Sequence, residues 1–547
     1  MKTPLDAPPV HSVGRSIWLY PLSTLTGISM AAFFLVHQVD VVRGSAARAT
    51  GFWDVFFTMT PADAAQVMGG IGEVIAAILG IVITVASIIV QLAATRYTAR
   101  VTDMFFRDRT NLMVMAVFVV SAVFSLWVNF SIRSAAAGGV SFVPYYGVLI
   151  TMALLTCCLL MMAPYFAYVF DFLEPDKIVG RIKAGGIGRA LRHGHNESDE
   201  QIGQRQMDAL SSLEQLADVA LNAIEAKDKG IATYTIDAIC DLIVAYSSQK
   251  QRLDERWYLI RGQLRRDPDF VSMNAAALEK LTTSHTWLEY KALRQYLMIF
   301  REALTQLPDI INLIAIDTRY MGQAAILAGD RSSLAIVVKF FNTYMRRALN
   351  ARDIAAGYNN LNQYRYLTEE LLKAGWSDEV TRVAEHFKYY AQTAQANKLA
   401  FLTETVAYDL CTINELAFDL EASSRDALLK TFLEVDKEAE LDQQEASLRG
   451  VRKAQVKLAT YYLHKGAEEL ARKIWRDMRD EKPDRLRSIK EELLAVTTSE
   501  FWEVNDRGGV FEYIEPERRK FIHAFFDWFP KISVRPPPAS AELGRGK

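Results

Sequence analysis

An almost wholly apolar run at residues 71–94 sets the strongest limit on how this chain can fold. At about 1.5 Å per residue, a helix of this length crosses a hydrocarbon core of roughly 30 Å. Because no proline interrupts residues 63–108, we expect the helix to leave the membrane and continue in water as far as Asp108. The sequence therefore predicts a membrane protein organised around one long helix.

The small and polar residues of this run follow one another at steps of three or four, which places them on one face of the helix. One interpretation is a packing face, which is the more common use of small residues in membrane helices. The other is the water-facing wall of a pore. The pore-lining candidates are Glu73, Ala77, Gly80, Thr84, Ser87, Gln91 and Thr95, with Arg96 and Arg100 as basic residues at the inner mouth.

Apolar segments elsewhere in the first third of the chain predict a transmembrane domain of four spans over residues 17–175. After a flexible N-terminus at residues 1–16, the spans are expected at about 17–36, 64–95 (continuing as a helix to 108), 111–130 and 145–170. Most Lys and Arg residues of the flanking segments fall on one side of this arrangement, and only Arg43, Arg48 and Arg133 fall on the other. Because positive charge marks the cytoplasmic side, both termini are predicted to be cytoplasmic.

The rest of the chain has the composition of a soluble helical domain. Glycines and mixed charges at residues 176–200 predict a linker. Residues 201–530 repeat apolar positions at helical spacing between turn residues, which predicts a cytoplasmic all-α domain of helical hairpins. Residues 509–514 are the only strand candidate, and residues 531–547 are expected to be a disordered tail.

One hairpin carries a more specific pattern near residues 455–483. Its small, aromatic and proline residues fall at the offsets of the tetratricopeptide repeat. Met478 replaces a residue that is usually small, and the preceding sequence shows no clean repeat, so an ordinary helical hairpin is an equal alternative. The matching residues are Leu458, Ala459, Tyr462, Ala471, Trp475 and Pro483.

Composition and motifs argue against several classes of function. The formal net charge is -2, which gives no support to nucleic-acid binding. The four cysteines have neither metal-ligand nor disulfide spacing, and His193 and His195 stand in a glycine-rich segment where histidines are usually solvated. No nucleotide loop, nucleophile elbow or zinc-protease motif is present. We therefore expect no enzyme activity, no catalytic residues, no cofactor and no metal site.

The end of the second span carries a run of matching residues, Gln91, Leu92, Ala93, Tyr97, Thr98, Arg100, Phe105, Arg107 and Asp108. In these residues it resembles a bacterial family of predicted membrane proteins, the domain of unknown function 2254. Ala99 stands where that family has proline, Arg96 where it has glutamine, and residues 223–231 lack the family's Ser-Pro and Asn-Asp-Pro turn. The resemblance extends to about residue 240. It implies the four-span architecture and a bacterial inner membrane, and it implies no reaction.

Two functions fit these expectations. The first is an oligomeric ion channel or permeation pore, lined by copies of the second span and gated by the cytoplasmic helical domain. The second is a membrane-anchored scaffold whose helical repeats bind a protein partner. An anchor needs only one span, so four spans with an ordered polar face favour the pore. The expected partners are the lipid bilayer, further copies of the chain and a protein on the helical domain, without nucleic acid.

Overall fold

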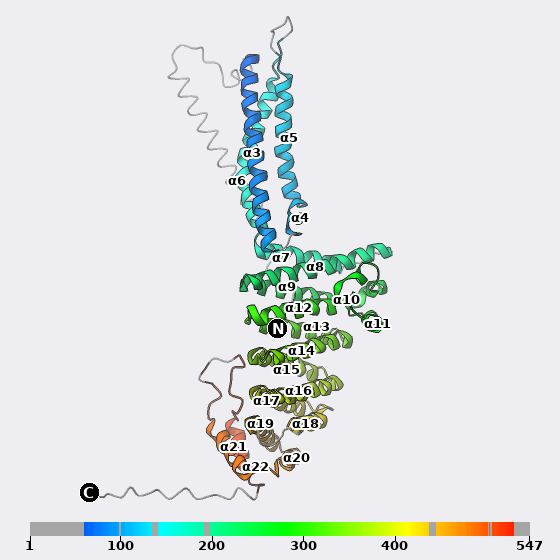
Figure 1. Ribbon diagram of the computed structural model, residues 1–547, viewed down its shortest axis with the longest axis vertical. Helices are drawn as coiled ribbons and strands as arrows, with labels where there is room; N and C mark the ends of the chain where they lie inside the picture. The colour runs from blue at the N-terminus through cyan, green and yellow to red at the C-terminus, as the bar shows by residue number, and fades with distance from the viewer. Residues whose placement is uncertain are drawn as a thin grey trace, which may run out of the picture. The chain divides into compact units, whose positions relative to one another are not determined.

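The computed structural model describes residues 59–97, 100–133, 141–190, 197–436, 445–501, 503 and 506–529 (Figure 1). Within these ranges the chain forms helices joined by irregular segments, and none of its elements is a strand. The predicted all-α fold class is confirmed. The chain divides into two compact units, Met1–Ile178 and Val179–Lys547. The predicted first span at 17–36, the flexible N-terminus, His193, His195 and the tail lie outside the described residues.

Three long apolar helices form a bundle in the first unit: α3 (Pro61–Arg96), α5 (Arg109–Ser131) and α6 (Tyr145–Phe172) (Figure 1). Each is long and apolar enough to cross a membrane, which agrees with the spans expected at 64–95, 111–130 and 145–170. Local chemistry sets where α3 starts. Thr60 caps it by accepting a hydrogen bond from the Asp63 backbone amide, and Pro61 occupies the first turn, where no amide donor is needed.

The second span does not continue as one helix to Asp108. α3 ends at Arg96, and a separate short helix, α4 (Arg100–Phe106), follows. Asp108 instead caps α5 by accepting from the Thr110 amide, and the Tyr168 hydroxyl donates to the same carboxylate at 2.5 Å. Capping needs an extended backbone at Asp108, so the absence of proline was not enough to keep this stretch helical.

The three spans share a small apolar core made of Met68, Ile71, Ile75, Val128 and Val148. Small residues bring the helices together around it. A Cβ atom at Gly72 of α3 would lie 3.5 Å from the Ser125 hydroxyl of α5. One at Gly147 of α6 would lie 3.1 Å from the methyl carbons of Val128. These contacts are typical of membrane helix packing, which depends on close approach.

The linker expected at residues 176–200 is wrong over most of its length. Residues Pro175–Ala190 form helix α7. Its glycines are explained by packing, because a Cβ atom at Gly186 would lie only 2.8 Å from the Ser212 Cβ and 2.9 Å from a methyl carbon of Leu242. The pattern that suggested flexibility therefore serves a close helix contact.

The second unit continues as a stack of helical hairpins (Figure 1). Short helices interrupt the stack between residues 250 and 283: η1 (Lys250–Arg252), η2 (Glu255–Tyr258), η3 (Leu264–Arg266), α10 (Pro268–Val271) and α11 (Ala275–Thr283). Residues 509–514, the strand candidate, are irregular. The longer helices are α8 (Asp199–Glu225), α9 (Lys229–Ser247), α12 (Trp287–Gln306), α13 (Ile310–Leu327), α14 (Arg331–Ala351), α15 (Ile354–Lys373), α16 (Ser377–Ala396), α17 (Ala400–Asp419), α18 (Arg425–Leu433), α19 (Glu445–His464), α20 (Glu468–Met478), α21 (Pro483–Ala495) and α22 (Pro516–Phe526).

The long helices of this array alternate between two layers. α9, α13, α15, α17 and α19 pack in succession in one layer, and α8, α12, α14, α16 and α18 follow one another in the other. α9 is also long and apolar enough to cross a membrane, but most residues of its apolar stretch are buried within the array. Close packing in the first layer is helped by Gly322 and Gly357, where a Cβ atom would lie 2.7 Å and 2.9 Å from leucine methyl carbons.

The array repeats about every 45 residues. Left-handed backbone residues recur at this interval, each in a turn between two consecutive helices. At each of these turns the next backbone amide closes a wide hydrogen bond to a carbonyl in the preceding helix, such as Asp330 to Ala325 and Trp376 to Leu371. This is the Schellman type of helix ending, which favours glycine. The recurring residues are His285, Gly329, Gly375, Glu421 and Gly466.

The hairpin predicted near 455–483 corresponds to α19 and α20, which pack against each other. Tyr462 is buried, as its place in the pattern suggested, but Trp475 is only half-buried and donates its indole N–H to the Trp528 carbonyl at 3.1 Å. The spacing of the array, about 45 residues, exceeds the roughly 34 residues of a tetratricopeptide repeat. The helical repeats are therefore present, with a longer unit than the sequence suggested.

Candidate functional site

The candidate site is the polar face of α3, and it lies opposite the face that packs. The side of α3 turned towards α5 and α6 buries Ile75, Ile78, Val82 and Ala86. Each candidate stands about half a turn away from a buried residue. Glu73, for example, is two residues from Ile75 and therefore about 200° round the helix from it. Two separate faces thus run along this one helix.

Six of the seven candidates are exposed, and Ser87 is half-buried. Gly80 has open space beside it, because a Cβ atom there would meet nothing within 4 Å. Thr84 donates its hydroxyl to the Gly80 carbonyl at 2.8 Å, and Thr95 donates to the Leu92 carbonyl at 2.8 Å. These hydroxyls satisfy their donors within the helix and still present an oxygen outward. The six exposed residues are Glu73, Ala77, Gly80, Thr84, Gln91 and Thr95.

The described neighbours of α3 do not pack against its small and polar face, so they do not support the packing interpretation. In the described part of the first unit, α5 and α6 cover the apolar face of α3 and leave the small and polar face uncovered. Gly80 shows the difference most clearly, since a glycine at a tight seam would have neighbours, as Gly72 and Gly147 do. Residue type alone favours packing, because it does not say which face of a helix a neighbour will contact.

The outward surfaces of α5 and α6 have a different character. They expose large apolar side chains such as Met113, Val120, Trp127 and Ile150, as expected of surfaces that face lipid tails. The polar face of α3 is instead bordered by branched apolar residues, with Ile81 at 49% and Leu92 at 66% exposure. The carboxylate of Glu73 and the amide of Gln91 would be costly in lipid, so this face needs another environment.

Of the two predicted inner-mouth arginines, Arg96 lies off this face, and Arg100 belongs to another helix. Arg96 directly follows Thr95 and therefore lies about 100° round the helix from it. Its guanidinium carbon stands 5.6 Å from the centre of the Tyr97 ring. Arg100 belongs to α4, beyond the end of α3. The basic ring expected at the inner mouth rested on an unbroken helix, and the break after Arg96 removes that basis.

A buried polar network at the far end of the bundle was missed by sequence reasoning. Asn111 donates its side-chain amide to the Phe105 carbonyl at 3.2 Å and accepts from the Tyr165 hydroxyl at 2.9 Å. Together with the Asp108–Tyr168 hydrogen bond, this network ties the turn between α4 and α5 to α6. Its only sequence signal was a pair of polar residues next to an apolar run, which is weak.

The polar face also extends further than predicted at its other end. Gln66 is exposed and lies seven residues before Glu73, two turns along the same face. A Cβ atom at Gly69 or Gly70 would meet nothing within 4 Å. The spacing of three and four residues extends to Gln66, although this residue precedes the apolar run.

The charged side chains of the array form compact ion-pair clusters. Lys250, for example, is buried and contacts Glu289 at 2.6 Å and Asp330 at 2.7 Å. Lys291 is buried against Asp267 at 2.7 Å and Asp269 at 2.9 Å. Among the described residues, no group of three or more His, Cys, Asp or Glu side chains has the arrangement of a metal site. Mutual pairing accounts for these clusters as stabilising contacts.

Comparison with known proteins gives one informative match. No curated protein matches the chain. One solved structure matches, a circular tandem repeat protein with novel repeat topology and enhanced subunit contact surfaces. It is 17% identical over 61% of this chain and 81% of its own, and its TM-score of 0.28 is too low to indicate a shared fold. Residues 14–230 match the family model described as predicted membrane protein (DUF2254). In its membrane half and first array helices, this membrane protein is therefore similar to family DUF2254.

Proposed function

We propose that copies of the chain assemble in the membrane with their α3 helices around a common axis, so that the polar face of α3 lines a pathway for ions or small solutes. One observation supports this most directly: the face that α5 and α6 leave uncovered is the small and polar one. With only the described helices around α3, a single copy would turn Glu73, Thr84 and Gln91 towards lipid, whereas a ring of copies turns them towards one another and water.

Each part of the proposed pathway has a role. Glu73 forms an acidic ring near one mouth and concentrates cations there. Gly80 and Thr84 form the middle, where a residue without a side chain leaves room and hydroxyl oxygens replace part of the hydration shell of a passing ion. Gln91 and Thr95 continue the polar wall. Because Arg96 lies off this face, the described part of α3 sets no basic ring opposite Glu73, and we expect the pathway to favour cations.

The other surfaces of the molecule also have a place in this proposal. The apolar surfaces of α5 and α6 face the lipid of a bacterial inner membrane, and the helical array lies in the cytoplasm, where its repeats hold the copies together and gate the pathway. The protein acts by permeation and not by catalysis.

Cysteine accessibility tests the pathway directly. In a chain whose native cysteines are replaced, Thr84→Cys and Gln91→Cys should react with a small, charged, water-soluble thiol reagent. Ile81→Cys and Leu92→Cys are matched controls, because they lie within one turn of Thr84 and Gln91 on α3 and are also exposed. They should stay unreactive, since thiols facing lipid do not ionise. Equal reactivity of both pairs, or of neither, would overturn the assignment of this face.

Oligomeric state and conductance separate the pore from a membrane-anchored scaffold. The purified protein should form a ring of several copies and conduct in a reconstituted bilayer. Glu73→Gln should lower cation preference without changing the number of copies, because it removes charge and keeps shape. A monomer without conductance, in which Thr84→Cys is inert, would favour the scaffold, with the predicted span at residues 17–36 covering the polar face.

A further inference from the structure

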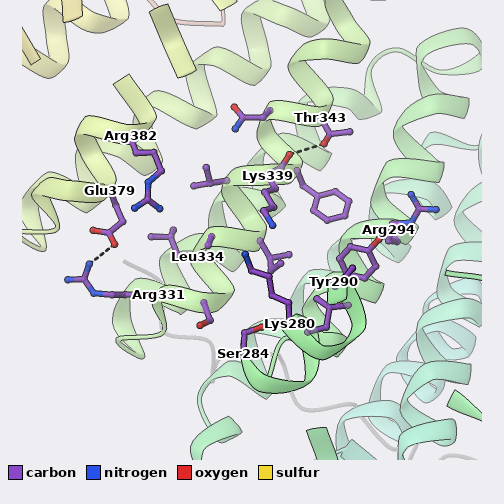
Figure 2. Close-up of a pocket in the computed structure, with 18 of the residues that line it drawn as sticks. Lys280, Ser284, Tyr290, Arg294, Arg331, Leu334, Lys339, Thr343, Glu379 and Arg382 are labelled. Atoms are coloured by element: carbon purple, nitrogen blue, oxygen red, sulfur yellow. Dashed lines mark hydrogen bonds and ion pairs between the residues drawn. The ribbon is translucent and has the colours of Figure 1, made fainter. Parts of the chain in front are cut away.

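A cavity of about 730 Å³ opens on the array between α11, α12, α14 and α16 (Figure 2). α14 and α16 pack less closely here than α15 and α17 do in the other layer, which leaves the space between them. The volume lies within the roughly 300–1,000 Å³ of small-molecule sites. The cavity has no part in the proposed pore.

Positive charge converges on the cavity from three helices. Lys280 of α11, Lys339 of α14 and Arg382 of α16 line it, and all three are exposed. Figure 2 shows Lys280 and Lys339 directed to the same part of the cavity, with Arg382 across from them. None of the three has an ion-pair partner among the described residues, although most buried cations of the array have one or more.

The acidic lining does not cancel this charge. Glu379 is the carboxylate of the lining, and it contacts Arg331 at 2.5 Å. Arg294, at the opposite side, contacts Asp269 at 3.0 Å. In each pair the two opposite charges neutralise each other. Lys280, Lys339 and Arg382 remain, and they give the cavity a net positive field. Cations held close together repel one another, and this arrangement gains stability when an anion binds between them.

Behind the cations, the cavity wall is apolar. Leu281, Leu297 and Leu334 are buried side chains of the lining, and Tyr290 adds a half-buried ring that packs edge-on against Phe340 at 5.9 Å between centroids. A site with one apolar wall and a few convergent polar groups is the usual form of a small-molecule pocket. A free inorganic anion would leave this wall without a partner.

We propose that this cavity binds an organic phosphate, with its phosphate groups held by Lys280, Lys339 and Arg382 and its apolar part resting on the leucine wall and Tyr290. Arg382 offers a planar fork of donors to phosphate oxygens, and the two lysines supply compact charges. Both a soluble nucleotide and the head of a lipid phosphate carry this chemistry. The inference is independent of the pore, because binding requires no conductance.

Calorimetric titration of the full chain in detergent tests the site and separates the two sources. ATP represents a soluble nucleotide, and dioctanoyl phosphatidic acid represents a lipid phosphate. At least one of them should bind, while adenosine lacks the phosphates and inorganic triphosphate lacks the apolar part, so both should bind about tenfold more weakly or not at all. Failure of both organic phosphates to bind would overturn the proposal, as would triphosphate binding as tightly as they do.

Variants of the three cations locate the binding. Lys280→Ala, Lys339→Ala and Arg382→Ala should each weaken binding of the organic phosphate about tenfold, because each removes a charged hydrogen-bond donor. Arg347→Ala is the matched control, since Arg347 is an exposed cation on α14 outside the cavity. Lys339→Arg should retain most of the affinity. Because these side chains are exposed, circular dichroism should show unchanged folding, and unchanged affinity in all three variants would contradict the site.

Discussion

Single glycines of this protein have opposite roles according to what lies beside them. Gly186 and Gly188 are two residues apart on α7, and the sequence offers no reason to treat them differently. A Cβ atom at Gly186 would lie 2.8 Å from the Ser212 Cβ, whereas one at Gly188 would meet nothing within 4 Å. The first glycine is required by packing and the second is not.

This contrast gives a paired prediction. Gly188→Ala should stabilise the protein by up to about 1 kcal/mol, because alanine is the better helix former. Gly186→Ala should be about 1–3 kcal/mol less stable than Gly188→Ala, because its methyl group overpacks the contact with α8 and α9. Thermal unfolding followed by circular dichroism measures both. Equal stability of the two variants would mean that α7 can shift away from Ser212 without cost.

Glu404 provides a prediction for pH. Burial, with added repulsion from Glu512, raises its pKa to about 7. The unfolded chain releases this proton near pH 4.5 and the folded chain keeps it to about pH 7, so stability falls as pH rises through this window. Glu404→Gln should remove that slope and stabilise the protein at pH 8 by about 1–3 kcal/mol. At pH 4 the variant should match the parent chain, and a gain of the same size there would point to packing instead of ionisation.

At the scale of elements, polar side chains fix where helices end and how they join. The turn before α5 exists because Asp108 caps that helix and accepts from Tyr168 of α6. In the array, Lys250 of η1 joins Glu289 of α12 to Asp330, the residue that caps α14. Its ammonium also donates to the Ser333 hydroxyl at 2.8 Å. One lysine therefore holds three elements in place.

Replacing this lysine should be costly. Lys250→Met leaves Glu289 buried with an uncompensated charge, which should lower the free energy of unfolding by about 3–5 kcal/mol. Denaturant unfolding measures the loss. Lys339→Met is the control, because Lys339 is exposed and without an ion-pair partner among the described residues, and it should change stability by less than about 0.5 kcal/mol. A loss of that small size for Lys250→Met as well would mean that water replaces the missing ammonium.

At the scale of the whole molecule, the chain joins a membrane unit to a helical array, and charge asymmetry predicts the array on the cytoplasmic side. The structure also selects better positions to test this than the sequence does. Gly186 is unsuitable for labelling because it has no room for a side chain. Ser141, between α5 and α6, and Glu200, at the start of α8, are both exposed.

The orientation can therefore be tested with two cysteines in a chain without its native ones. A membrane-impermeant thiol reagent added to intact cells should label Ser141→Cys and should not label Glu200→Cys. Permeabilised cells serve as the control, since both positions should then react. Labelling of Glu200→Cys in intact cells would place the array outside and reverse the predicted topology.

The sequence determined those features that depend on composition along one short stretch of chain. Apolar runs of sufficient length gave α5 and α6 and most of α3, because a bilayer requires about 20 apolar residues in a row. Helical spacing likewise gave the all-α array. These signals are local, so no knowledge of neighbours was needed to find them.

Tertiary structure decided which neighbour each face receives. Spacing placed Glu73, Gly80 and Thr84 on one face, but only the packed bundle showed that α5 and α6 take the opposite one. The break after Arg96, the helix at α7 and the cationic cavity of α14 and α16 likewise depend on contacts between residues far apart in sequence. Such contacts leave no mark in local periodicity, since a helix of the same composition can present any of its faces to a partner.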